Sequence, residues 1–306
     1  MGLFQGSVPL IALLLGCLWL AGAGCRQAAG PAELSATPVG RAILARNLAA
    51  DELLPAAAMD SVLAAETDLP VGRRLGGWAR RFLADGGVIY RFGPAAGGYV
   101  AEGLLVSDHR QDCVSLVYRC SELARAADRH DAVAVAVRTR FAGAPLDSLA
   151  DRDGRVDYDR PEHLDFSLDM IRSGHWGRDL TPDLAGAVPD TAGSSRYRPG
   201  SFVYLPTAAL AGGAGTALRE GDIVWLVLDP RDEAGRRLRQ LGLVIGHLGI
   251  VILEQGRPWL VHAASRGLPG RYEGGTVVAV PLVEYLQRVD RFCGLLVTRL
   301  SDTAVD

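Results

Sequence analysis

The chain contains no lysine, so all 32 of its basic residues are arginines. They are balanced by 35 acidic residues, which gives a formal net charge of −3, and aromatic residues make up only 7% of the chain. A nucleic-acid groove requires a basic surface interleaved with aromatic side chains, and no segment of the sequence has that pattern. We therefore set nucleic-acid binding aside as a function class.

Cysteine and histidine are also scarce, with five and six residues respectively. The sequence has no His-x-x-x-His or Cys-x-x-Cys pair, so we expect no metal site and no cofactor. If residues 113 to 120 are helical, Cys113 and Cys120 lie about 10.5 Å apart along the axis, beyond the roughly 7 Å that a disulfide bridges. A bond between Cys120 and Cys293 is the pairing that geometry leaves open.

The N-terminal 25 residues have the layout of a secretory signal, with an apolar run from Val8 to Ala21 followed by small residues. The run is short for a membrane span. Because it ends at Cys25, it resembles a bacterial lipoprotein signal, which implies lipid attachment at Cys25 and a membrane-anchored protein in the periplasm or on the outer surface. Cleavage after Ala23 by the ordinary signal peptidase and an uncleaved anchor are the alternatives.

Composition divides the rest of the chain into three segments. Hydrophobic residues make up 49% and charged residues 22% of the sequence, which is typical of a globular protein. Residues 26–38 are rich in alanine, proline and glycine and predict a tether. Residues 39–70 predict a helical extension with a break near Pro55, and residues 71–306 predict the main domain.

Within the main domain, helical patterns come first and strand patterns afterwards. Helices are expected over residues 75–86 and 160–174, and a loop over 186–201. Five runs rich in Val, Ile and Leu predict strands, over residues 222–229, 247–254, 258–264, 276–282 and 293–300. This order predicts an α+β fold in which the helices pack on an antiparallel sheet.

Cys113 is expected in the first turn of a helix. Residues 113 to 124 carry apolar side chains broadly on one helical stripe, and Asp112 occupies the capping position before them. The free backbone N–H groups and the dipole of a helix start favour a thiolate over a thiol. The alternative is that Cys113 is a small buried hydrophobe.

His247 and His262 lie in two strands separated by Gln255-Gly256, a two-residue hairpin turn signal. If Glu254 pairs with Arg257, Gly249 pairs with His262. The two histidines then share one face of the sheet as diagonal neighbours. One imidazole is placed to take the thiol proton and the other to orient it; taken singly, each histidine is equally compatible with a structural role.

These residues resemble the motifs of the NlpC-type papain-like cysteine peptidases of bacterial cell-wall turnover. The motifs are Asp112-Cys113, Gly221-Asp222, His247-Leu248-Gly249-Ile250 and His262-Ala263-Ala264-Ser265, in the family's order. The resemblance implies a papain-like core, with Cys113 as nucleophile, His247 as base and then acid, and His262 as the orienting residue. It also implies an oxyanion site made by the Cys113 backbone N–H and one further donor, which the sequence does not identify.

A closer resemblance is to a branch grouped with N-acetylmuramoyl-L-alanine amidases, long described as a domain of unknown function. The matching segments are Gly98-Tyr99-Val100, Tyr158 to His163, and Glu284-Tyr285-Leu286. This likeness makes Tyr99, Asp112, Arg160 and His163 candidates for substrate binding. A buried structural Tyr99 and a solvated helix start at Arg160 and His163 are the alternatives.

Together, the two resemblances imply an exported hydrolase that cleaves an amide bond in peptidoglycan or muropeptides, as an N-acetylmuramoyl-L-alanine amidase does. Three other functions stay open. The chain is also compatible with an endopeptidase of the stem peptide, with an acyltransferase or lipid-processing thiol hydrolase on the same scaffold, and with a non-catalytic envelope-binding module.

Overall fold

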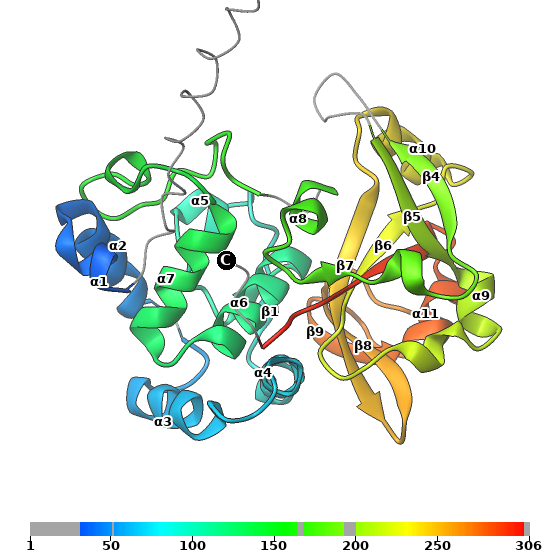
Figure 1. The fold of residues 1–306 in the computed structure, drawn as a ribbon, viewed down its shortest axis with the longest axis horizontal. Helices are drawn as coiled ribbons and strands as arrows, with labels where there is room; N and C mark the ends of the chain where they lie inside the picture. The colour runs from blue at the N-terminus through cyan, green and yellow to red at the C-terminus, as the bar shows by residue number, and fades with distance from the viewer. Residues whose placement is uncertain (1–30, 51, 165–167, 193–199, 303–306) are drawn as a thin grey trace, which may run out of the picture.

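We analysed a computed structural model of the chain, which describes residues 31–50, 52–164, 168–192 and 200–302 (Figure 1). The expected signal segment 1–25, with Cys25, lies outside the described residues. Among the helices that are described, none has the length and apolar character needed to cross a membrane.

The described part contains helices first and most of the strands afterwards. Helices α1 to α11 span Pro31–Ala36, Pro38–Leu48, Ala56–Glu66, Val71–Asp85, Tyr99–Glu102, Cys113–Arg125, Arg129–Arg140, Leu168–Ser173, Thr207–Ala211, Glu233–Gln240 and Leu282–Arg288. Strands β1 to β10 span Ile89–Tyr90, Arg110–Gln111, Arg178–Asp179, Val188–Ala192, Gly200–Pro206, Ile223–Leu228, Ile245–Glu254, Arg257–Ala264, Thr276–Pro281 and Phe292–Arg299.

The main sheet has the strand order β4-β5-β10-β6-β7-β8-β9, with β3 paired to β10, and its pairings are antiparallel. The first seven helices lie on one side of it, and α9, α10 and α11 lie on the other (Figure 1). Each side has its own apolar cluster. The predicted α+β class, with N-terminal helices and an antiparallel sheet, is therefore confirmed.

The N-terminal helices share the core of the main domain. Leu34, Ile43 and Met59, from α1, α2 and α3, are fully buried in the same apolar cluster as residues of α6 and β7. The segment 39–70 thus has no core of its own. The predicted tether over 26–38 is wrong from Pro31 onward, because α1 forms there and Leu34 anchors it in the core.

Two local predictions also need correction. Of the helix expected over 160–174, the described residues form α8, while Pro161 and the turns around it keep residues 160–164 irregular. The loop expected over 186–201 contains β4 and the start of β5, which pair from Val188↔Tyr204 to Ala192↔Gly200. The five predicted strands correspond to β6, β7, β8, β9 and β10.

Candidate active site

The start of α6 is fixed by Asp112. One carboxylate oxygen of Asp112 accepts hydrogen bonds from the N–H groups of Val114 (3.0 Å) and Ser115 (2.8 Å), while the Ser115 hydroxyl accepts one from the Asp112 N–H (2.8 Å). This reciprocal arrangement is a capping box. The second carboxylate oxygen accepts from the Gly93 N–H at 2.8 Å. Asp112 therefore holds both the helix start and the loop at Gly93, and Cys113 is the first helical residue.

Helix α6 is buried along nearly its whole length, because α4, α7 and β7 all pack against it. Two buried ion pairs connect α6 to neighbouring segments. Arg119 bonds Asp108 at 2.7 Å, and Arg140 of α7 bonds Glu122 through two hydrogen bonds of 2.7 and 2.8 Å. Buried charges persist in a protein when they are paired in this way. The helix that carries Cys113 is thus a rigid central element.

Cys113 lies where the start of α6 meets β7. Cys113 as a whole is partly exposed. Its sulfur interacts with the backbone N–H groups of Leu248, Val114 and Cys113 itself, which lower the thiol pKa. Burial and the Asp112 carboxylate act in the opposite direction and prevail, so the pKa of Cys113 is raised above its ordinary value. The expectation that the helix start leaves a thiolate is therefore wrong: desolvation and the capping carboxylate outweigh the N–H groups.

The hairpin that carries the histidines has the predicted register. Glu254 pairs with Arg257, and the turn residues Gln255 and Gly256 have φ values of 52° and 75°, which suit a tight turn of the type I′ class. A Cβ on Gly249 would come within 3.1 Å of the His262 Cβ. Gly249 thus gives His262 room on the face that His247 shares.

The two imidazoles are hydrogen-bonded to each other. His247 Nε2 lies 2.7 Å from His262 Nδ1, and the ring planes are close to perpendicular, at 81°. His262 is fully buried and His247 is partly exposed. Burial, followed by the charge of Arg291, lowers the pKa of His247 to about 4, and burial with the neighbouring His247 lowers the pKa of His262 well below its ordinary value. Both rings are therefore neutral at pH 7.

Two tyrosines, Tyr272 and Tyr285, continue the contacts of this histidine pair. His262 Nε2 lies 3.5 Å from the Tyr272 hydroxyl, which hydrogen-bonds Tyr285 of α11. The Tyr285 ring contacts His262 at 4.9 Å and His247 at 6.5 Å between ring centroids. Burial, followed by electrostatic interaction with Tyr272 and Cys113, raises the pKa of the Tyr285 hydroxyl. The sulfur and both imidazoles thus surround Tyr285. Within the described residues no hydrogen bond joins the sulfur to either ring, and Nδ1 of His247 carries none.

Tyr90 belongs to the site, although the sequence did not single it out. It ends β1, which pairs in parallel with β2, so that Tyr90 lies beside Gln111, two residues before Cys113. Its half-buried hydroxyl hydrogen-bonds Ser265, and its pKa is raised by burial and by the nearby Cys113 and Asp112 charges. The signal available in the sequence was Ser265, the last residue of the second histidine motif.

Tyr99, by contrast, is a buried core residue. Its ring packs edge-on against Tyr118 and Tyr158 at 6.3 and 5.3 Å, and it interacts electrostatically with Asp112 at the helix start. The structural alternative is the one that the geometry favours for Tyr99.

Arg160 and His163 are not brought to Cys113 by any contact of the described residues. Arg160 bonds Glu162 and the Ser148 carbonyl, while His163 stacks on Phe141 at the end of α7 and lies 3.4 Å from the Tyr118 hydroxyl. Both therefore lie on the α7 side of α6. The three described cysteines, Cys113, Cys120 and Cys293, are free, and Cys120 is fully buried.

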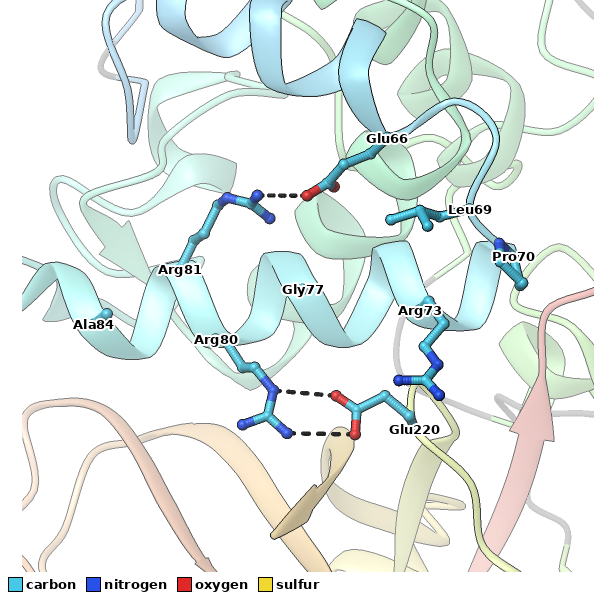
Figure 2. Close-up of a pocket in the computed structure, with 9 residues that line it drawn as sticks. All are labelled: Glu66, Leu69, Pro70, Arg73, Gly77, Arg80, Arg81, Ala84 and Glu220. Carbon is cyan, nitrogen blue, oxygen red and sulfur yellow. Dashed lines mark hydrogen bonds and ion pairs between the residues drawn. The ribbon is translucent and has the colours of Figure 1, made fainter.

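A pocket of about 680 Å³ lies elsewhere, along α4 (Figure 2). Arg80 reaches from α4 to Glu220, before β6, and to Glu254 at the end of β7. Arg81 pairs with Glu66 of α3. None of the candidate catalytic residues lines this pocket, so we assign it to the contact between the helices and the sheet.

The fold, rather than the sequence, connects this chain to known proteins. No protein-family model matches it, and no curated protein matches it. A Legionella pneumophila protein of family DUF1460 has a similar structure, with a TM-score of 0.57 at 15% identity over 80% of this chain and 94% of that one. An N-acetylmuramoyl-L-alanine amidase from Bacteroides uniformis gives 0.51 at 20% identity over 76% and 99%. The resemblance predicted from the motifs is confirmed as a shared fold.

Proposed function

We propose that this protein is an exported cell-wall hydrolase with a papain-like, NlpC-type core, which cleaves an amide bond in peptidoglycan by a Cys113-His247-His262 mechanism. The observation that carries the proposal is the meeting of a partly exposed cysteine, at a capped helix start, with a strand whose histidine is hydrogen-bonded to a second, buried histidine. The similarity of fold to an N-acetylmuramoyl-L-alanine amidase supports the amide between the lactyl group and L-alanine as the bond that is cleaved.

The first half of the reaction begins from a neutral thiol and a neutral imidazole, because burial raises the pKa of Cys113 and lowers that of His247. As the sulfur attacks the amide carbonyl, its proton passes to Nδ1 of His247, the ring nitrogen without a hydrogen bond. The S–C bond forms and the carbonyl π electrons move to oxygen. We assign the oxyanion to the Cys113 N–H and the Tyr90 hydroxyl.

The second half returns the enzyme to its starting state. The tetrahedral intermediate collapses, the C–N bond breaks, and His247 gives its proton to the departing amine. Water then attacks the thioester while His247 takes one of its protons, and the acid leaves as the thiol is restored. His262 accepts a hydrogen bond from Nε2 of His247 throughout, which fixes the His247 ring and leaves its Nδ1 to exchange protons with the sulfur.

The signal-like layout of the N-terminal segment supports a place of action outside the cytoplasm. We propose that residues 1–25 direct export and that a lipid on Cys25 holds the protein at the membrane, with the wall as its substrate. The stem-peptide endopeptidase is the second candidate, since it uses the same chemistry on a different amide.

Digestion of purified muropeptides tests the proposal. We expect the wild type to release peptides with a new L-alanine amino terminus together with the free lactyl acid of the sugar. Cys113→Ala should lower the rate by about 10⁴-fold or more, with a melting temperature within a few degrees of wild type. Cys293→Ala, which removes another partly exposed thiol, should keep full activity.

Three results would contradict parts of this assignment. Equal activity of Cys113→Ala and wild type would remove the thiol mechanism. New amino termini inside the stem would replace the amidase with the endopeptidase. Inert wild-type protein on every wall fragment would favour a binding module.

A further inference from the structure

Phe92 is a large apolar side chain that the protein leaves in water. Only four large hydrophobic residues of the described part are exposed, namely Leu69, Ile89, Phe92 and Leu241, and Phe92 is the aromatic one, with 51% of its surface exposed. An exposed aromatic ring costs free energy in the empty protein, and such residues mark contact sites when they lie beside a reactive centre.

The backbone fixes Phe92 beside the nucleophile. Two hydrogen bonds hold the residues on either side of it to the segment that leads into Cys113: the Arg91 N–H bonds the Gln111 carbonyl at 3.0 Å, and the Gly93 N–H bonds the Asp112 carboxylate at 2.8 Å. The Phe92 carbonyl accepts from the Ala95 N–H at 2.9 Å. The position is thus preorganised, although the ring is exposed.

The backbone pairing places Phe92 close to the segment that carries the nucleophile. Tyr90 pairs with Gln111 in the parallel β1–β2 ladder, which ends at these two residues. Beyond the ladder, Phe92 lies between Arg91 and Gly93, whose N–H groups bond the two residues that precede Cys113. Tyr90, Phe92 and Cys113 therefore lie on neighbouring backbone segments.

We propose that Phe92 is a specificity-determining residue whose ring stacks on the sugar at the acyl side of the scissile amide. This inference rests on the proposed amidase function. In that substrate a pyranose lies a few bonds from the scissile carbonyl, and the C–H face of a pyranose is apolar and flat, which suits the negative face of an aromatic ring. An endopeptidase substrate presents an amino acid at that place.

A membrane surface is the competing occupant. Among the described residues, the large exposed apolar side chains near the site are Ile89 and Phe92, and the exposed Arg91 lies between them in the sequence. A single ring with one aliphatic neighbour suits one ligand ring better than a bilayer, which is bound by a larger apolar area.

Matched substrates with and without the sugar test the inference. One is a disaccharide-peptide muropeptide, and the other carries a lactyl group amide-linked to the same peptide. We expect Phe92→Ala to lower kcat/KM about tenfold on the first substrate and less than twofold on the second. Phe92→Trp should retain the preference for the sugar. Leu241→Ala, a change at a side chain that is 62% exposed after α10, should alter neither rate.

Each other outcome overturns the inference. Equal losses on the two substrates would mean that Phe92 only supports the scaffold, and two unchanged rates would mean that it contacts neither. Loss of binding to anionic lipid vesicles with both rates unchanged would assign the ring to a membrane. These failures differ from failure of the proposed function, in which wild type hydrolyses neither substrate or Cys113→Ala hydrolyses both.

Discussion

The hydrogen bond between the two imidazoles gives each ring nitrogen a different task. For Nδ1 of His247 to accept the thiol proton, Nε2 of the same ring must carry a hydrogen, which it donates to Nδ1 of His262 over 2.7 Å. His262 then holds its own hydrogen on Nε2, the nitrogen near the Tyr272 hydroxyl. Because His262 is fully buried, this tautomer is held without competition from water.

The charge of Arg291 provides a pH test of His247. Arg291 is exposed, precedes Phe292, which stacks on the His247 ring at 6.2 Å, and helps to lower the His247 pKa to about 4. A base must be neutral, so kcat/KM of wild type should fall as pH drops through about 4. Arg291→Gln removes a positive charge, so the His247 pKa should rise and the acidic limb should move upward by a few tenths of a pH unit.

The control for this pH profile is Arg237→Gln, which removes an exposed arginine of α10 that pairs with Glu233. Its limb should coincide with that of wild type. If the acidic limb of the kcat/KM profile in Arg291→Gln stays at the same pH as in wild type, or moves to lower pH, a group other than His247 produces that limb.

Tyr90 is the residue whose removal tests the oxyanion assignment. Tyr90→Phe keeps the ring and deletes only the hydroxyl, so we expect kcat to fall by roughly 10²–10³ with little change in KM or melting temperature. Steady-state kinetics on muropeptides measures both constants. Tyr204→Phe removes a hydroxyl that bonds Cys293 instead and should leave kcat unchanged. A kcat for Tyr90→Phe within twofold of wild type would mean that the Tyr90 hydroxyl is not the second oxyanion donor.

At the scale of elements, α6 and the β7–β8 hairpin could be predicted because their signals are local. Asp112 directly precedes Cys113 and caps the helix through N–H groups two and three residues after itself. Gln255-Gly256 fixes the hairpin register, which places His262 opposite Gly249. Short stretches of sequence determine such local hydrogen bonds and turn geometry. The part of the site made by these two elements was therefore accessible from the sequence alone.

The rest depends on contacts between distant segments. Strand β1 has two residues and exists only because it pairs with β2, twenty-one positions later, so Tyr90 carried no periodic signal. Strand β4 contains Pro189, a residue type that predicts a loop. The strand nevertheless pairs with β5 at an edge of the sheet, where proline is tolerated. The Cys113 pKa likewise depends on how deeply the packed helices and sheet bury the thiol, which no motif encodes.

The cap of α6 links the stability of the helix to the reactivity of the thiol. The Asp112 carboxylate raises the Cys113 pKa, so a neutral cap should lower it. Asp112→Asn and Asp112→Ser both keep an oxygen that can accept from the N–H groups of Val114 and Ser115. We expect the alkylation midpoint of Cys113 to fall by about one pH unit in both variants, at a cost of roughly 1–3 kcal/mol because the Gly93 N–H loses its acceptor.

The measurement is the rate of iodoacetamide labelling against pH in a Cys293→Ala background, where the remaining described thiols are Cys113 and the fully buried Cys120. Wild-type Asp112 in the same background is the reference. Midpoints that stay the same in both neutral variants would mean that burial alone sets the thiol pKa.

At the scale of the whole molecule, the site depends on how the helical half meets the sheet, since Cys113 comes from one and both histidines from the other. Arg80 of α4 crosses this boundary to Glu220 (Figure 2). It also pairs with Glu254 at the end of β7. Glu220 also accepts from the Leu253 N–H at 2.6 Å. The two backbones approach closely beside this ion pair, where a Cβ on Gly221 would lie 2.1 Å from the Gly72 carbonyl oxygen.

Gly221→Ala therefore tests whether this close approach holds the two halves together. The change adds a methyl group where backbone atoms of α4 already lie, at a φ of 81° that alanine adopts only with strain. We expect a loss of unfolding free energy of about 3 kcal/mol or more, measured by denaturant unfolding. Gly86→Ala is the matched control, because its φ of 68° imposes the same strain but its Cβ meets no atom within 4 Å; it should cost only about 1 kcal/mol. Equal losses in the two variants would mean that backbone strain alone causes them. The close approach of Gly221 to α4 would then add nothing to stability.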